Sequence, residues 1–376
     1  MAISAAGIIF SNLNNSTLSR LTSDRTVAAI PFACRYRLVD FCLSNLVNSN
    51  ISNINIVVNY NHRSLIEHLG SGKDWDLARR GSGIKVISPY QTAYSSSTQV
   101  FSTHLEALKN MKEYISEYKE DYVVLMDSDY VLNIDIANVI ESHRATGAEI
   151  TFVTTRVNPD FTAKNPKMMI SSNAGRIVDI AMNSAYNQSN PELSINMFVM
   201  STAHLRRIIE EADAYNLNSL TSFFLNNYRS SNYMTYLYDG FVASVSSFLD
   251  YYKYSMQLAE DESARASLLW KKEAPIFTKV NNSYPTVHCE GATVKNSMIA
   301  DECVIEGTVI NSVIFRGVHI GRGAVVKNSV LFHGTTVSDN AELNCIVTDK
   351  DVFISKGVKL SGNNNMPFYV QKKRKV

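Results

Sequence analysis

The sequence predicts an α/β protein with two domains: a Rossmann-like domain with a mixed or parallel sheet, then a C-terminal left-handed parallel β-helix. In residues 1–260, short apolar runs alternate with amphipathic segments of helical spacing, which is typical of a parallel sheet covered by helices on both faces. In residues 286–362, short apolar pairs recur every 15–17 residues, about one coil of a hexapeptide β-helix. Residues 261–285 show neither pattern and are predicted to be a linker, and residues 363–376 a tail.

The first half of the chain supplies the parallel part of the predicted sheet. Apolar runs bounded by polar turns predict strands, and apolar residues three or four positions apart predict helices. The expected strands are residues 3–10, 54–58, 84–87 and the start of 123–135, and the expected helices are 38–47, 64–69, 98–118 and 135–145.

The second half of the first domain is expected to be mixed. Residues 168–171 and 176–182 flank the turn sequence Ser-Asn-Ala-Gly, and together they predict a hairpin. The remaining expected strands are 149–157, 193–200 and 233–238, and the remaining helices are 204–212, 220–228 and 248–258. The last helix carries a tyrosine stripe, which at helical spacing indicates core packing rather than a ligand cage.

The β-helix is predicted from the repeat Asn-Ser-(Met/Val)-(Ile/Leu). It occurs at residues 296–299, 311–314 and 328–331, with a degenerate fourth copy at 344–347. Single coils leave their strand edges unpaired, so such coils must stack. This repeat is a weak functional signal, because acyltransferases and scaffolds share it. His319 and His333 are either bases for acyl transfer or isolated surface histidines.

Composition excludes several classes of function. Lys and Arg total 36 against 35 Asp and Glu, a formal net charge of +1, which gives no support to a nucleic-acid-binding surface. No stretch approaches the roughly 20 apolar residues of a membrane span. The five cysteines form no CxxC pair and fit reduced thiols in a cytoplasm. The ending QKKRKV is similar to a nuclear-import or phosphate-binding run, but we expect a solvated, disordered terminus.

A pair of carboxylates marks the centre of the chain. Asp127 and Asp129 follow the buried run 123–126, and ligands collect beyond the carboxyl ends of strands in open α/β sheets. Two carboxylates there could hold a hard divalent cation that carries a nucleotide. The alternative is that they cap and solvate a turn, since Asp is common in turns.

Residues 31–45, PFACRYRLVDFCLSN, resemble the PFGGRYRIIDFALSN stretch of bacterial glucose-1-phosphate adenylyltransferase, also called ADP-glucose pyrophosphorylase. The resemblance extends along nearly the whole chain and covers a sugar-phosphate nucleotidyltransferase domain and a β-helix. Its other motifs are residues 73–77 (KDWDL, family GxPWDLD), 125–135 (family LSGDHIYxMD), 175–179 (family GRIVEF) and 311–317 (NSVIFRG, family NSVLFxG).

The resemblance implies a reaction whose machinery is largely missing here. In the family, glucose 1-phosphate attacks the α-phosphate of ATP, and catalysis depends on positioning and charge neutralisation. The family's glycine-rich phosphate loop corresponds to residues 9–21, which contain no glycine. Five positions of this chain correspond to functional side chains of the family. A family lysine corresponds to Val27, a glutamine to Asn59, and the lysine that holds the sugar phosphate to Asn183. The second metal aspartate corresponds to Ser244, and the first corresponds to Asp129, the only one of the five that is retained.

Two arginines of the family's motif are present in this chain. Arg35 and Arg37 lie in RYR, where family members bind an anionic effector, and alternate residues of an extended segment could both face one phosphate. The alternative is that they form surface or interface salt bridges.

The pattern resembles the GlgD-type subunit that accompanies the catalytic subunit in some Gram-positive bacteria. It predicts a cytoplasmic, catalytically deficient regulatory or structural subunit in a mixed tetramer with a catalytic glucose-1-phosphate adenylyltransferase. We expect no cofactor for this chain alone and Mg²⁺ in the partner. Two alternatives stay open: an active nucleotidyltransferase with a site rebuilt around Asp127 and Asp129, and a stand-alone sensor of sugar phosphate or nucleotide.

Overall fold

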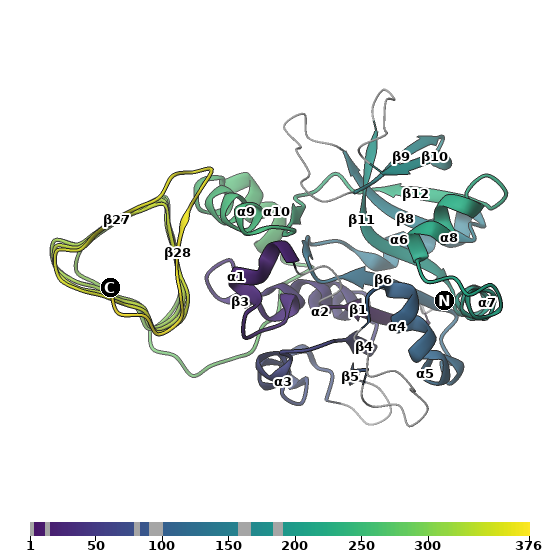
Figure 1. Cartoon of the computed structure of the whole chain (residues 1–376), viewed down its shortest axis with the longest axis horizontal. Helices are drawn as coiled ribbons and strands as arrows, with labels where there is room; N and C mark the ends of the chain where they lie inside the picture. Colours follow the sequence, from purple (N-terminus) through teal and green to yellow (C-terminus); the bar gives the residue numbers. More distant parts are fainter. Residues whose placement is uncertain (1–3, 12–15, 79–82, 90–100, 157–166, 183–190) are drawn as a thin grey trace.

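A computed structural model describes residues 4–11, 16–78, 83–89, 101–156, 167–182 and 191–376. Figure 1 shows two bodies, a helix-covered sheet and a β-helix seen almost along its axis, with α9 and α10 between them. The predicted α/β domain followed by a β-helix is confirmed.

The first body is built on a nine-stranded sheet with the order β5-β4-β1-β6-β11-β8-β12-β10-β9. Its first four strands are mutually parallel, and β11 pairs antiparallel with both β6 and β8. The sheet is therefore mixed, as predicted. Its strands are β1 (Ala5–Phe10), β4 (Asn53–Val57), β5 (Gly83–Ile87), β6 (Tyr122–Asp127), β8 (Ile150–Arg156), β9 (Met168–Asn173), β10 (Arg176–Met182), β11 (Glu192–Ser201) and β12 (Tyr233–Leu237). Two short ladders lie beside it, β2 (Pro31–Phe32) with β3 (Tyr36–Arg37) and β7 (Tyr130–Val131) with β13 (Ala243–Ser244).

Helices cover both faces of this sheet. Their apolar side chains form one core cluster with α4, α5, α7 and α8 and a second with α2, α3 and α6. Each cluster removes one face of the sheet from water, which is the main source of stability for this architecture. The helices of the chain are α1 (Ser19–Thr22), α2 (Leu38–Asn48), α3 (Arg63–Leu69), α4 (His104–Asn110), α5 (Lys112–Ser116), α6 (Ile136–Thr146), α7 (Thr202–Ala214), α8 (Leu220–Asn227), α9 (Phe248–Glu260) and α10 (Glu262–Leu269).

The single helix predicted over residues 98–118 was wrong in its extent. The described part contains α4 and α5, which are separated at Met111. Helix α4 begins after Thr103, whose hydroxyl accepts a hydrogen bond from the backbone N–H of Glu106. A Thr three residues before a Glu is a capping signal, so the sequence contained the true start of the helix.

Three five-stranded parallel sheets form the predicted left-handed β-helix. Its interior is a separate core of aliphatic side chains and Cys303. The three sheets are β14 (Val287–His288), β17 (Val304–Ile305), β20 (His319–Ile320), β23 (Thr336–Val337) and β26 (Phe353–Ile354); β15 (Thr293–Lys295), β18 (Thr308–Ile310), β21 (Val325–Lys327), β24 (Glu342–Asn344) and β27 (Lys359–Ser361); and β16 (Met298–Ile299), β19 (Val313–Ile314), β22 (Val330–Leu331), β25 (Ile346–Thr348) and β28 (Phe368–Val370).

The repeated asparagine is a turn residue, and its register corrects one prediction. Asn296, Asn311 and Asn328 have φ between 44° and 47°, a left-handed conformation that Asn tolerates well. In the fourth coil this conformation falls on Cys345, with φ 55°, so the repeat there is 345–348 rather than 344–347. Asn344 instead accepts a hydrogen bond from the Asn328 amide at 2.9 Å.

The linker predicted over residues 261–285 contains helix α10. Asp261 caps this helix by accepting hydrogen bonds from the backbone N–H groups of Ser263 and Ala264. Beyond α10, the backbone N–H of Phe277 donates to Ser44 at 2.8 Å. This segment is therefore held against the first body, because its polar backbone groups find side-chain partners on α2.

The ending QKKRKV, residues 371–376, was predicted to be solvated and disordered. All six residues are exposed, but the prediction of disorder was wrong, because this ending pairs with the last coil. Strand β28 pairs in parallel with β25, and Lys375 forms a bridge with Phe353. The charged side chains of this ending face water, while its backbone groups complete the open edge of the last coil.

Among the residues described, no helix is both long and apolar enough to cross a membrane.

Candidate functional site

The first candidate site, which we name the cleft, is the cluster of Asp127, Asp129, Tyr130, Lys167 and Ser244 at the carboxyl end of β6. Asp127 ends this strand, and Asp129 directly precedes β7. Strand β7 pairs with β13, which places Ser244 opposite Tyr130, and the backbone N–H of Val245 donates to the Asp129 carbonyl at 2.7 Å. Two segments more than 100 residues apart thus meet. Ser244, which the resemblance aligns with the family's second metal aspartate, lies beside Asp129, which it aligns with the first.

Asp127 is committed to protein partners. Its two carboxylate oxygens face the His104 Nε2 at 2.6 Å and the Asn196 amide, which donates at 2.8 Å. Burial opposes protonation of His104, but Asp127 raises its pKa above the ordinary value. Asn196 lies at a register irregularity of β11 with φ 52°, which turns its side chain into the cleft.

Asp129 faces a lysine that the sequence did not single out. Lys167 is 9% exposed, and its ammonium group donates to the Tyr130 hydroxyl at 2.9 Å and to the Ser244 hydroxyl at 3.0 Å. Burial raises the pKa of Asp129 to about 6, although Lys167 acts in the opposite direction. Burial also disfavours the charged form of Lys167, but Tyr130 and Asp129 raise its pKa above the ordinary value.

These contacts do not fit a divalent cation bound between two carboxylates. Ser244 offers a neutral hydroxyl, which Lys167 already occupies, and Asp127 is occupied by His104 and Asn196. Among the described residues, no group of three or more His, Cys, Asp or Glu side chains could hold a metal ion. The hypothesis of a cation held by Asp127 and Asp129 therefore has no support in the geometry.

The other positions of interest have structural surroundings. Val27 is 4% exposed and packs in an apolar cluster between the domains. Asn59 exchanges two hydrogen bonds with the backbone of Phe101, at 2.9 and 3.0 Å. Asn183 and residues 12–15, part of the segment that the resemblance aligns with the family's phosphate loop, lie outside the described residues. His319 is paired with Glu306 at 3.1 Å.

A second candidate site lies between the two bodies. A cavity of about 370 Å³ is lined by β3, the end of α3, residues 278–281 and four successive turns of the β-helix. Arg35 and Arg37 both line it. Among the described residues neither forms an ion pair: Arg37 donates to the backbone and hydroxyl oxygens of Ser64, and the Arg35 guanidinium lies 5.8 Å from the Tyr36 ring centroid.

The charge of this cavity is predominantly positive. Its lining includes five basic residues and two acidic ones, which are Arg35, Arg37, Lys279, Arg316, Lys350, Glu67 and Glu302. Burial lowers the pKa of Lys350 to about 8, and Arg37 and Arg25 act in the same direction. Burial likewise lowers the pKa of Arg37 to about 10. Excess positive charge with partial burial is the environment that favours a bound anion.

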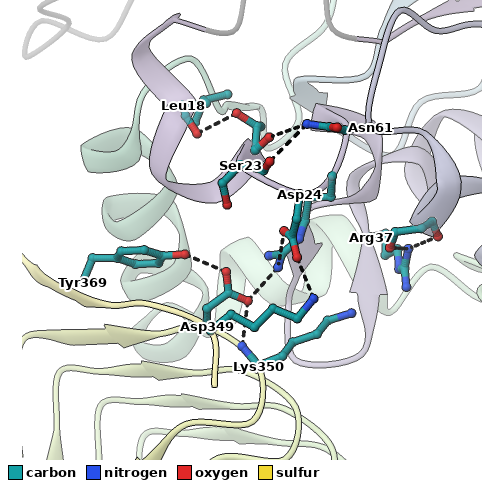
Figure 2. Close-up of polar contacts among 12 residues, drawn as sticks. Leu18, Ser23, Asp24, Arg37, Asn61, Asp349, Lys350 and Tyr369 are labelled. Carbon is teal, nitrogen blue, oxygen red and sulfur yellow. Dashed lines mark hydrogen bonds and ion pairs between the residues drawn. The ribbon is translucent and has the colours of Figure 1, made fainter. Parts of the chain in front are cut away.

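A buried ion pair lies next to this cavity, because its Asp349 directly precedes Lys350 of the lining. Arg25 from the first body and Asp349 from the β-helix meet at 2.7 Å and are 2% and 1% exposed. Figure 2 shows Asp349 beside Tyr369. The other Asp349 oxygen accepts from the Tyr369 hydroxyl at 2.6 Å, and Lys372 pairs with Asp24 at 2.6 Å. The predicted tail thus contributes two side chains to the interface between the domains.

The fold and the cleft together define the class: a nucleotidyltransferase domain followed by a hexapeptide β-helix. The family described as Nucleotidyl transferase matches residues 7–180, and the one described as GlmU-like, C-terminal hexapeptide matches residues 285–367. The chain belongs to the family of GlgD and the glucose-1-phosphate adenylyltransferases.

Similar proteins support that membership. The chain is 30% identical to the glycogen biosynthesis protein GlgD of Bacillus subtilis (strain 168) over 370 residues, which cover 97% of this chain and 95% of that protein. It is 28% identical over 356 residues to a glucose-1-phosphate adenylyltransferase of Bacillus thuringiensis (strain Al Hakam), and 27% identical over the same length to that of Bacillus mycoides (strain KBAB4), with 93% of each chain covered.

Proposed function

We propose that this chain is a catalytically deficient regulatory or structural subunit of a bacterial glucose-1-phosphate adenylyltransferase, acting in the cytoplasm in glycogen synthesis. It pairs with a catalytic subunit in a mixed tetramer, and the holoenzyme converts ATP and glucose 1-phosphate to ADP-glucose and pyrophosphate. The chain itself uses no cofactor, and Mg²⁺ belongs to the catalytic partner.

The observation that carries this proposal is the neutral Ser244 beside Asp129. Nucleotidyl transfer needs the developing phosphate charge to be neutralised, and a metal ion between carboxylates supplies much of that. Here the serine hydroxyl accepts a hydrogen bond from Lys167. Val27 adds an apolar side chain where the family has a lysine. An active enzyme rebuilt around Asp127 and Asp129 is disfavoured, because His104 and Asn196 engage both oxygens of Asp127.

The first prediction concerns activity. The purified chain should form ADP-glucose at least about a thousandfold more slowly than the catalytic partner, since removing single groups that stabilise the transition state already costs about 10²–10³ in rate. The assay is ADP-glucose formation by the chain alone, by the partner alone and by the two together. In the mixture, the rate or the effector response of the partner should change, which requires contacts that differ between its active and inactive states.

A matched control separates the two subunits. A complex of this chain with a partner whose own metal aspartate is replaced by Asn should be inactive. Turnover by that complex, or by this chain alone at a rate near the partner's, contradicts the proposal.

The cavity between the domains supports a second part of the proposal, binding of an anionic effector by Arg35 and Arg37. A sensor that works without a partner is the alternative use of the same cavity. Both require the isolated chain to bind an anion, and a regulatory subunit additionally requires that the anion change the rate of the holoenzyme.

The second prediction is the pH dependence of this binding. Lys350 loses its proton as pH rises through about 8, so inorganic phosphate should bind about tenfold more weakly at pH 9.5 than at pH 7.5, the worth of one charge-assisted hydrogen bond. The pKa of Lys350 in the folded protein lies below its ordinary value of 10.5, so the cost of burying this charge is present below pH 8 and is relieved as the pH rises above it. The other titratable or charged groups near Lys350 or lining the cavity are Arg25, Asp349, Lys372, Arg35, Arg37, Glu67, His68, Lys279, Glu302, Arg316 and His333.

Isothermal titration with phosphate at both pH values checks this prediction. In the Lys350→Met variant the affinity should be weak and nearly constant between pH 7.5 and 9.5, whereas Arg35→Ala should weaken binding at both. A pH dependence that survives in Lys350→Met would assign the effect to another group.

A further inference from the structure

The most unusual side chain in the cleft is Lys167. A lysine that is 9% exposed is rare in a protein interior unless it is paired. Lys167 directly precedes β9 and lies outside the two segments that form the base of the cleft, yet its ammonium group contacts one side chain on each, Tyr130 on β7 and Ser244 on β13. It also lies 4.7 Å from the Tyr130 ring centroid, within the range of a cation–π contact.

The position of this ammonium group follows from the β7–β13 ladder. Tyr130 and Ser244 are register partners, and the residue before Tyr130 is Asp129. A cation that bridges the two strands at this point therefore lies where Asp129 and a carboxylate at position 244 would hold a metal ion. Asp129 and Asp127 both interact electrostatically with Lys167.

We propose that Lys167 is a built-in cation: its ammonium group takes the structural place of a divalent metal ion between β7 and β13, so that the cleft keeps its shape without a metal and excludes one. This goes beyond the proposed function, because it concerns what holds the cleft together and not what the chain does in a complex. A serine at position 244 suits this arrangement better than a second metal-binding carboxylate, since a hydroxyl accepts one hydrogen bond from an ammonium group without adding charge. Mg²⁺ would have to displace a like charge and would find a neutral ligand, whereas it is ordinarily held through carboxylates.

The third prediction tests this directly on the isolated full-length chain with Mn²⁺ as the probe. Wild-type protein should bind no Mn²⁺ in this cleft at millimolar concentrations. The double variant Lys167→Met/Ser244→Asp, which removes the ammonium group and supplies a second carboxylate, should bind Mn²⁺ at least tenfold more tightly than wild type, measured by titration with paramagnetic detection.

The single variants keep the inference falsifiable if the double variant does not fold. Ser244→Asp retains Lys167, so it should gain no Mn²⁺ affinity, and its melting temperature should rise because the new carboxylate pairs with the ammonium group. Lys167→Met should lower the melting temperature, whereas Lys85→Met, at an exposed position on β5, should leave it unchanged.

Three results would overturn the inference: Mn²⁺ binding by wild type as tight as in the double variant, a gain of Mn²⁺ affinity in Ser244→Asp alone, or a melting temperature of Lys167→Met equal to that of the Lys85→Met control. Metal binding by wild type without ADP-glucose formation would remove this inference and leave the proposed function standing. Turnover by the isolated chain with no metal bound in this cleft would contradict the proposed function and leave this inference standing.

Discussion

Asp349→Asn should reduce the free energy of unfolding by about 3–5 kcal/mol, the range for breaking a buried ion pair by removing one partner. The substitution keeps the size of the side chain but leaves the Arg25 guanidinium, 2% exposed, without its buried counter-charge. Asp24 remains 3.0 Å from Arg25, but it is 37% exposed and already pairs with Lys372. Its compensation is therefore partial, and the buried Arg25 Nη1 has no hydrogen-bond partner among the described residues.

Denaturant-induced unfolding followed by fluorescence and circular dichroism measures this loss. The matched control is Glu342→Gln, which removes the partner of Lys359 in an ion pair of 2.8 Å whose side chains are 53% and 71% exposed. That change should cost about 0–1 kcal/mol, because water screens exposed pairs. A loss in Asp349→Asn no larger than in the control would mean that the buried pair contributes nothing net.

Deletion of residues 363–376 should cost roughly 4 kcal/mol or more of the free energy of unfolding. The deletion removes β28, whose Val370 is 4% exposed, and burying such a side chain is worth about 1.5–3 kcal/mol. It also uncovers β25 and removes the Tyr369 hydroxyl that donates to buried Asp349, and leaving a buried acceptor unsatisfied costs about 1–3 kcal/mol.

A charge-neutralised variant separates the strand from its basic residues. Replacing Lys372, Lys373 and Lys375 with Gln keeps β28 and removes only exposed charges, so it should lose about 1 kcal/mol or less. Equal stability of the deletion variant and wild type would support the disordered tail that the sequence alone predicted.

The periodic parts of the fold could be predicted from the sequence, because their signals are local. Buried strands such as β1 and β6 are continuous apolar runs, and the Asn-Ser repeat marks the turn of each coil. The fourth copy was assigned one residue too early, since Asn344 suggested the repeat while the left-handed conformation falls on Cys345. Helix α10 was missed because few of its side chains are buried, mainly Ala264 and Leu268, which leaves a faint periodic pattern.

The candidate sites were less predictable, because their partners are distant in sequence. The resemblance identified Ser244 and Asp129, and the structure brings these together through β7 and β13. Lys167 was not predicted as a site residue, because a lysine before a short strand gives no sign of being buried. Its partners Tyr130 and Ser244 are 37 and 77 positions away in the sequence. The contacts of His104 and Asn196 with Asp127 were unpredictable for the same reason. His104 lies at the start of α4 and Asn196 at an irregularity of β11, both far from Asp127 in the sequence.

The Arg25–Asp349 pair also has a consequence during protein synthesis. The two residues are 324 positions apart, so at roughly 5–20 residues per second the ribosome adds Asp349 about 16–65 s after Arg25. During that interval the nascent first domain carries an arginine without its later counter-charge. The apolar cluster between the domains, which includes Phe32 and Phe41, also lacks the β-helix side chains that pack against it. Newly made chains therefore pass through a stage with an uncovered apolar surface, at which a chaperone or a partner subunit would have its strongest influence on assembly.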